Sequence, residues 1–282
     1  MLRKIFAAAT LAGLVAMAAP AVAGSTRETL KEVHWSFESP FGQYDQAQLQ
    51  RGFKIYKEVC SACHSLNQIA FRNLGDKGGP FWNPKYTPND NPVVKAIAKD
   101  YQIADIDSDS GDAIKRPGVP ADYFPSPFSN AAAARAANGG AVPPDMSLLA
   151  AAREGGPAYI YSVVTGDGTD APAGLTIPDG KYYDPWMSGD VSSYFKNPGH
   201  KVPKGGFIAM PPPLIADRVT YDDGTKATIE QEGKDISAFL QWASDPHMEE
   251  RKTLGLSVMI FLFLFSGVIY ASYRTIWRNV GH

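Results

Sequence analysis

The chain has very little cysteine: only two among its 282 residues, both in the run Cys60-Ser61-Ala62-Cys63-His64. A zinc site needs a second ligand pair, and none is suitably spaced. A thioredoxin-like dithiol needs a βαβ context, which the neighbouring sequence lacks. The chain also lacks an internal repeat, a convincing set of alternating strands, an evident nucleophile or general base, and a nucleotide-binding loop. These absences favour a mainly α protein that performs no substrate chemistry of its own.

The motif Cys-x-x-Cys-His is typical of covalent c-type haem attachment. Two thiols at this spacing can each bond one vinyl-derived arm of the porphyrin, and the adjacent imidazole can reach one face of the iron. The sequence therefore predicts one covalent haem c attached to Cys60 and Cys63, with His64 as an axial ligand.

Residues 1–23 have the pattern of a secretory signal peptide. Arg3 and Lys4 precede a small, apolar stretch, and residues 21–23 match an A-x-A-type cleavage site. An uncleaved N-terminal helix is the alternative, but the stretch is short and rich in alanine. A mitochondrial presequence would be richer in arginine and serine. We expect the mature chain to begin at Gly24 in a bacterial periplasm.

A second apolar segment lies near the other end of the chain. The 20 residues 253–272 contain no charged side chain, and as a helix they would span about 30 Å, the thickness of the bilayer hydrocarbon. A buried core helix is the alternative, but one apolar on every side needs a larger protein around it. Tyr270, Tyr273 and Trp277 have the positions of interfacial anchors. We expect residues 251–282 to form a single-pass anchor in the bacterial inner membrane, with a short cytoplasmic tail because the rest is exported.

The predicted exported part is acidic. The chain has 27 basic and 29 acidic residues, and six of the basic ones lie outside residues 24–250, which leaves 21 against 29, a net charge of −8. Such a charge serves solubility, or it steers a basic soluble partner toward the protein. Nucleic-acid binding is not expected of an exported acidic domain.

Residues 24–250 are predicted to form one domain of class I cytochrome c-like fold, mainly α with long loops. The chain contains 26 glycines and 22 prolines, many of them in long connecting stretches. The first helix should begin after Asp45, a plausible cap, and the last near Lys234. We expect these two helices to cross where Gly52 allows Phe239 to approach. Further helices are expected at residues 145–153, 158–165 and 131–137.

The second axial ligand decides the chemistry, because iron held on both faces transfers electrons whereas an open face binds small molecules. Met210 is the favoured ligand, since the three prolines that follow it stiffen its loop. The residue pattern leaves alternatives, in falling order: Met187, Met146, and the histidines His34, His200 and His247.

An ordered set of further segments accompanies the haem motif. These are residues 36–38, 41–42, 45–52, 60–65, 141–147, 155–161, 165–166, 208–214, 221–228, 238–243 and 251–252. With this set the chain resembles the cytochrome c1 family, the haem subunits of cytochrome bc1 complexes, over nearly the whole mature length. The resemblance implies thioether bonds at Cys60 and Cys63 and axial ligands at His64 and Met210.

The resemblance also implies residues around the haem. A Pro-Pro-Asp segment covers the histidine side, which matches Pro143 and Pro144, and a backbone carbonyl near there should accept the imidazole Nδ1–H. Arg153 matches an arginine that neutralises a propionate, with a solvated helix-end arginine as the alternative. Tyr159 matches an aromatic packed near the haem and Asn138 an asparagine before it, with ordinary packing or a turn as the alternative for both.

Two segments depart from the family pattern or remain open. The chain lacks the extra cysteine pair that ties down a loop in some bacterial relatives, and residues 187–205 are lengthened instead. The acidic run Asp105, Asp107, Asp109 and Asp112 is interpreted as a disordered, solvated loop, with a docking patch as the alternative.

The resemblance implies electron relay within a quinol–cytochrome c reductase. One electron would pass from a Rieske iron–sulfur protein, through the haem, to a soluble or anchored c-type cytochrome, beside a cytochrome b subunit in the lipid bilayer. Such a chain is a redox subunit and is not catalytic alone. Two alternatives are a free-standing anchored shuttle cytochrome and a haem enzyme subunit with an open iron site.

Overall fold

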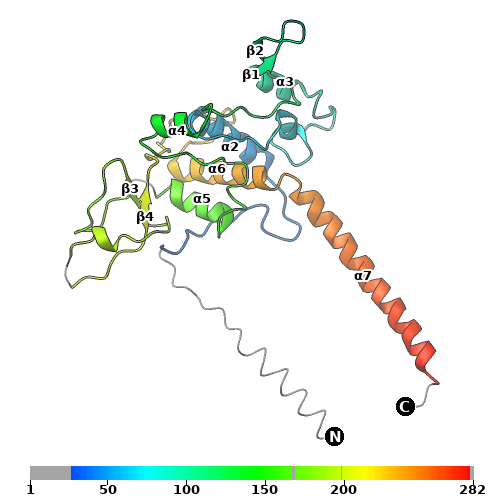
Figure 1. Cartoon of the computed structure of the whole chain (residues 1–282). Coiled ribbons are helices and arrows are strands. Elements are labelled where there is room, and N and C mark those ends of the chain that lie inside the picture. Colours follow the sequence, from blue (N-terminus) through cyan, green and yellow to red (C-terminus); the bar gives the residue numbers. More distant parts are fainter. Residues whose placement is uncertain (1–26, 167–168, 198, 280–282) are drawn as a thin grey trace.

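The computed structural model describes residues 27–166, 169–197 and 199–279, and within them the protein is mainly α (Figure 1). The predicted signal peptide lies outside the described residues. The helices are α2 (Gln46–Glu58), α3 (Pro92–Lys99), α4 (Ala131–Ala137), α5 (Gly156–Val164), α6 (Ile229–Ser244) and α7 (Met248–Trp277), with the short 3-10 helices η1 (Cys60–Ala62), η2 (Phe71–Gly75) and η3 (Ser192–Tyr194). The strands are β1 (Gln102–Ile106), β2 (Ala113–Pro117), β3 (Tyr182–Asp184) and β4 (Gly206–Ile208).

Helices α2 and α6 cross at the centre of the domain, as the sequence predicted. The side chain of Asp45 caps α2 by accepting hydrogen bonds from the N–H groups of Ala47 and Gln48. At the crossing, a β-carbon added to Gly52 would lie 2.6 Å from the β-carbon of Phe239. Only glycine permits this approach. The close contact packs α2 against α6, and the haem motif follows directly at the end of α2.

Aromatic rings fill the space around the crossing. Phe53 and Tyr56 of α2 lie 5.8 and 5.9 Å from the ring of Phe239, and Phe239 lies 5.5 Å from Trp242. Phe124, from a loop, packs 6.0 Å from Tyr56. Tilted and edge-to-face pairs at these distances are favourable, so a rigid aromatic core lies directly beneath the haem motif.

Helix α6 begins at Ile229, earlier than the start predicted near Lys234. The hydroxyl of Thr228 accepts a hydrogen bond from the N–H of Gln231 and so supplies the cap. The first turn contains Glu230 and Glu232, which suit the positive end of a helix dipole. The prediction missed this turn because its apolar positions are sparse.

The helix predicted at residues 145–153 does not form; the segment is a series of turns. The Asp145 carboxylate accepts hydrogen bonds from the Ser65 hydroxyl, the Asn67 N–H and the Ser147 N–H. The N–H of Met146 donates to the carbonyl of Ser65. Asp145 and Met146 are therefore bound to the segment that follows the haem motif, and the residues after them form local turns. The helices predicted at residues 131–137 and 158–165 correspond to α4 and α5.

Two antiparallel hairpins occur where no strand set was expected. Strands β1 and β2 pair Gln102 with Pro117 at one end and Ile106 with Ala113 at the other. The acidic run, interpreted from the sequence as a disordered, solvated loop, belongs to this hairpin: Asp105 lies in β1, and Asp107, Asp109 and Asp112 lie in the turn. Asp105 pairs with Arg116, and the carboxylate of Asp107 accepts hydrogen bonds from two N–H groups of the turn. The second hairpin pairs β3 with β4, directly before Met210.

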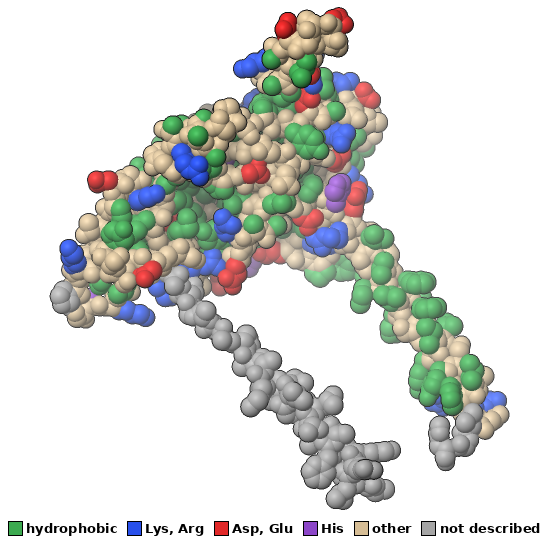
Figure 2. All heavy atoms as spheres, in the orientation of Figure 1, with side chains coloured by type: hydrophobic (Ala, Val, Ile, Leu, Met, Phe, Trp, Pro, Cys, Tyr) green, Lys and Arg blue, Asp and Glu red, His purple; other side chains and the backbone are tan. Residues whose placement is uncertain are grey.

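Helix α7 leaves the domain as an isolated rod (Figure 1), and its apolar side chains are exposed on the face seen in Figure 2. It is the one helix in the described part of the chain that is long and apolar enough to cross a membrane, and an 18-residue window within it has a mean hydropathy of 2.3. Residues 245–247 alone separate it from α6. This elbow is fastened, because the hydroxyl of Tyr44 donates to the carbonyl of Asp245 at 3.1 Å and Arg251 pairs with the Asp245 carboxylate.

Candidate haem site

The Cys-x-x-Cys-His motif forms a tight turn at the end of α2. The N–H groups of Cys63 and His64 both donate to the carbonyl of Cys60, at 3.1 and 2.9 Å. Both thiols are free, Cys60 half-buried and Cys63 exposed. The fold therefore presents two thiols and an imidazole from one turn, as covalent haem attachment requires.

The ring of His64 is held by the segment predicted to cover it. Its Nδ1 atom lies 2.8 Å from the carbonyl oxygen of Pro144, the contact expected near the Pro-Pro-Asp segment. Burial lowers the pKa of His64, while the Pro144 carbonyl and the nearby Asp145 carboxylate oppose that shift. The ring is therefore neutral at pH 7, with the proton on Nδ1 and the Nε2 lone pair left for a metal.

The covering segment is itself tied to the haem motif. Partial burial would raise the pKa of Asp145, but hydrogen bonds from Asn67, Ser147 and Ser65 outweigh it and lower the pKa. The ionised carboxylate accepts the Ser65 hydroxyl and the Asn67 N–H, each at 2.8 Å. These bonds join Asp145 to the residues that follow His64, and so hold the carbonyl of the adjacent Pro144 next to the His64 ring.

The three candidate methionines occupy different surroundings. Met146 is buried in the hydrophobic core, at 7% exposure. The sulfur of Met187 accepts a hydrogen bond from the hydroxyl of Tyr159 at 3.3 Å. Met210 is half-buried, directly after β4 and before the three prolines. The first two side chains have partners within the protein, which favours Met210 as the thioether available to a ligand.

The loop of Met210 is anchored on both sides. Upstream, β4 pairs with β3, where Tyr182 faces Ile208. Downstream, Leu214 is buried and packs in the core. The intervening prolines have fixed φ angles. The chain thus stiffens this loop with a hairpin and prolines, without a disulfide.

The other residues implied by the resemblance lie in three environments. Arg153 is exposed, and in the described part of the chain its guanidinium donates to the carbonyl of Ala152 without a carboxylate partner. Tyr159 is half-buried on α5. Asn138 ends α4, and its side-chain amide donates to the carbonyl of Ala134 at 2.7 Å. Asn138 therefore has a structural role as a helix end, whereas Arg153 is available for an external anion.

Two arginines near the site were not predicted from the sequence. The guanidinium of Arg27 stacks over the ring of Tyr159 at 5.0 Å. Burial raises the pKa of the Cys60 thiol to about 12, and the charge of Arg218 opposes that shift. Both arginines are distant in sequence from the residues they approach, so no local pattern could have indicated them.

This donor set fits a covalently attached haem. Two free thiols, a neutral imidazole oriented by a backbone carbonyl and a half-buried thioether on a stiffened loop are the groups that hold haem c. A haem bound here would be attached to Cys60 and Cys63, with His64 available as a ligand of its iron.

Comparison with known proteins gives the family. The model of the Cytochrome C1 family matches residues 35–280. A protein of Rhodospirillum rubrum named cytochrome c1 is 42% identical, over 96% of each chain. The mitochondrial cytochrome c1 haem protein of Kluyveromyces lactis is 41% identical, over 81% of this chain and 69% of that protein.

A protein of Bradyrhizobium diazoefficiens named cytochrome b/c1 is 46% identical over 87% of this chain. The match spans only 35% of that longer protein. The family model and the full-length bacterial match cover the haem motif, the loop of Met210 and the apolar helix α7. The chain therefore belongs to the cytochrome c1 family, the membrane-anchored electron-transfer subunits of cytochrome bc1 complexes, whose members carry one covalently bound c-type haem.

Proposed function

We propose that this chain accepts single electrons from a Rieske iron–sulfur protein and delivers them to a soluble or anchored c-type cytochrome. It does so beside a cytochrome b subunit in the same membrane. The name cytochrome b/c1 of the Bradyrhizobium relative supports that neighbour. When bound, the haem supplies a one-electron iron couple, and the chain holds it, tunes it and leaves one edge accessible.

The proposed axial ligands are His64 and Met210. The observation that carries this assignment is the 2.8 Å contact between Nδ1 of His64 and the carbonyl of Pro144, which directs Nε2 away from the protein backbone. A histidine and methionine pair raises the reduction potential relative to two histidines. Such a potential suits an electron carrier late in a respiratory chain.

The surroundings of the haem support the relay as well. Arg153, exposed and without a carboxylate partner among the described residues, is proposed to neutralise a propionate. Tyr159 and Pro144 line the haem, and Asn138 fixes the segment before them. The net charge of −8 over residues 24–250 supports encounter with a basic acceptor, at rates that fall as salt rises.

The proposed topology follows the two apolar ends. Residues 1–23 are the signal peptide, residues 24–250 the periplasmic haem domain, and residues 251–282 the anchor with its cytoplasmic tail. The acceptor cytochrome is then met in the periplasm, on the same side as the Rieske domain.

Two experiments test the relay. The purified chain should contain six-coordinate, low-spin haem whose ferrous spectrum does not change under carbon monoxide. A high-spin ferrous haem that binds the gas would instead favour a haem enzyme with an open site. In gentle detergent, the chain should migrate with cytochrome b and a Rieske protein, and migration alone would favour the anchored shuttle.

A further inference from the structure

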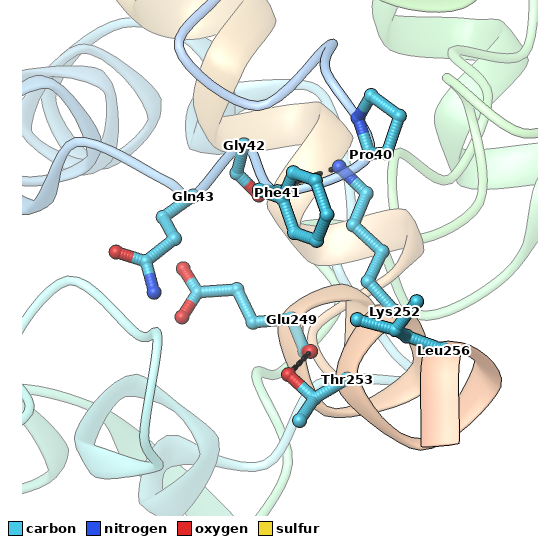
Figure 3. A pocket seen from close by; sticks show the side chains of 8 residues that line it. All are labelled: Pro40, Phe41, Gly42, Gln43, Glu249, Lys252, Thr253 and Leu256. Atoms are coloured by element: carbon cyan, nitrogen blue, oxygen red, sulfur yellow. Dashed lines mark hydrogen bonds between the residues drawn. The ribbon is translucent and has the colours of Figure 1, made fainter. Parts of the chain in front are cut away.

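A pocket lies where the haem domain meets helix α7, away from the haem site (Figure 3). Its volume is about 260 Å³. One wall is a loop of the domain and the other is the first two turns of α7. The lining residues are Pro40, Phe41, Gly42, Gln43, Glu249, Lys252, Thr253 and Leu256.

The loop presents a large apolar side chain to solvent. Phe41 is 76% exposed, and Pro40 beside it is exposed too. Burial of a phenylalanine side chain away from water is favourable, so contact with an apolar partner would stabilise this ring. Phe37, in contrast, is buried and stacks on Trp35 at 5.5 Å, so the loop is anchored by one aromatic residue and displays another.

The loop is rigidly joined to α7. The Lys252 ammonium donates to the carbonyls of Phe37, Ser39 and Gly42, at 2.6, 2.8 and 3.3 Å. The N–H of Tyr44 donates to the Glu249 carboxylate at 2.9 Å. The position of Phe41 is therefore fixed relative to the helix axis.

These contacts also lower the free-energy cost of moving the loop out of water. Three carbonyls and one ammonium satisfy each other, and the N–H of Gly42 donates to the carbonyl of Ser39. Polar groups that are already paired cost little to dehydrate, whereas unpaired groups cost several kcal/mol in hydrocarbon. The carbonyls of Phe37, Ser39 and Gly42 and the N–H of Gly42 are thus already paired within the protein, and the loop displays Pro40 and Phe41 as its apolar surface.

The level of the loop along α7 indicates what covers it. The uncharged segment of α7 starts at Thr253, and both Thr253 and Leu256 line the pocket with Phe41. The apolar surface of the loop is therefore continuous with the start of the surface that faces lipid. Phenylalanine, tryptophan and leucine side chains form the apolar face of helices that lie at the boundary between lipid headgroups and acyl chains.

We propose that Phe41 and Pro40 form a second membrane contact, which inserts into the lipid headgroup region beside α7 and sets the tilt of the haem domain. Together with α7, this contact gives the domain two points of attachment to the bilayer. A domain held by a single helix would rotate and tilt, whereas two points fix one face toward the membrane.

The test measures the depth of the loop in a lipid nanodisc. Phe41→Cys places a thiol in a chain whose other two cysteines are consumed by the haem, and a spin label attached there reports contact with oxygen and with a water-soluble nickel chelate. Ser110→Cys at the hairpin tip and Leu262→Cys within α7 are the matched aqueous and hydrocarbon controls. Pro40→Cys gives a second label on the same loop, and an unchanged haem spectrum shows that each variant is folded.

We expect the ratio of oxygen to nickel contact at positions 41 and 40 to lie between the two controls, for the isolated full chain and for the intact complex. A ratio equal to that of position 110 would overturn the proposal, because the loop would lie in water. Loss of contact with both reagents in the intact complex would overturn it too, because a protein neighbour would then cover Phe41.

Discussion

Gly52 of α2 and Phe239 of α6 lie so close that a β-carbon at position 52 would be 2.6 Å from the β-carbon of Phe239. The first helix leads into the haem motif and the last leads into the membrane helix. This one contact therefore sets the distance between the two functional ends of the domain.

Gly52→Ala should destabilise the protein by about 1–3 kcal/mol, the usual cost of overpacking a core. The backbone of Asp235 and the side chain of Phe239 both obstruct the added methyl group, so the helices must separate. Urea unfolding of the haem-loaded chain in detergent, followed by haem absorbance, measures the change. Gly255→Ala, where a β-carbon meets nothing within 4 Å, is the control, and equal stability of both variants would contradict the crossing.

Arg51→Met should cost about 3–5 kcal/mol, because it leaves a buried carboxylate without its ionic partner, and the amides of Gln48 and Gln231 that still donate to it carry no charge. Nε of Arg51 lies 2.9 Å from Asp235, whose side chain is fully buried. Adding Asp235→Asn to this variant should recover part of the loss. The comparison is Lys54→Met, which removes a pair with the exposed Asp222 and should change the unfolding free energy by less than about 1 kcal/mol. A similar loss of unfolding free energy in both variants would show that the buried pair of Arg51 and Asp235 stabilises the protein no more than the exposed pair does.

Met210→Leu should lower the reduction potential strongly, since removal of a thioether ligand takes away its preference for ferrous iron. Met187→Leu should change the potential little, because the Met187 sulfur already accepts the Tyr159 hydroxyl. Redox titration of both variants, with spectra under carbon monoxide, measures the effect. The opposite result would reassign the ligand to Met187.

Stability should fall between about pH 4.5 and pH 7 because of Glu232. Burial raises the pKa of this carboxyl to about 7, although the Val219 N–H and the Arg218 charge oppose the shift. The folded protein thus binds the proton of Glu232 more tightly than the unfolded chain does. The contribution of this proton to the free energy of unfolding is complete below the ordinary pKa of 4.5 and is lost as pH rises to 7, by on the order of 3 kcal/mol.

Glu232→Gln should remove this pH dependence and make the protein more stable than the parent at pH 8. Glu230→Gln is the control: Glu230 lies two residues before Glu232 in α6 but is exposed, so this variant should leave the change of stability with pH unaltered. Urea unfolding at several pH values is the measurement. A parental slope that persists in Glu232→Gln would assign the dependence to another group.

The sequence predicted features whose causes are local. The cap at Asp45 and the haem motif each act within a few residues, and the structure has the helix where it was expected. The crossing with Phe239 is a distant contact, but a glycine and an aromatic residue on two predicted helices were enough to indicate it. The sequence could not predict that residues 145–153 form turns, because Asp145 is bound to Ser65 and Asn67, about 80 residues away. The hairpin of β1 and β2 was missed for a different reason: none of its strand residues is fully buried, so no run of apolar core positions marks the strands in the sequence.

The same division holds for the site. The thiols, the imidazole and the expected carbonyl partner follow from motif spacing and the resemblance, and Pro144 supplies that carbonyl. The stacking of Arg27 on Tyr159 and the approach of Arg218 to Cys60 depend on the path of long loops. No periodicity encodes such paths, so they become visible only in three dimensions.

The short elbow between α6 and α7 has a consequence for electron transfer. The joint has three residues, and Tyr44 and Arg251 are bound across it, so the fold fixes the position of the haem domain relative to α7. Electron transfer to and from the haem then depends on the movement of partner proteins. A flexible insert that lengthens the elbow would let the haem domain move independently of α7.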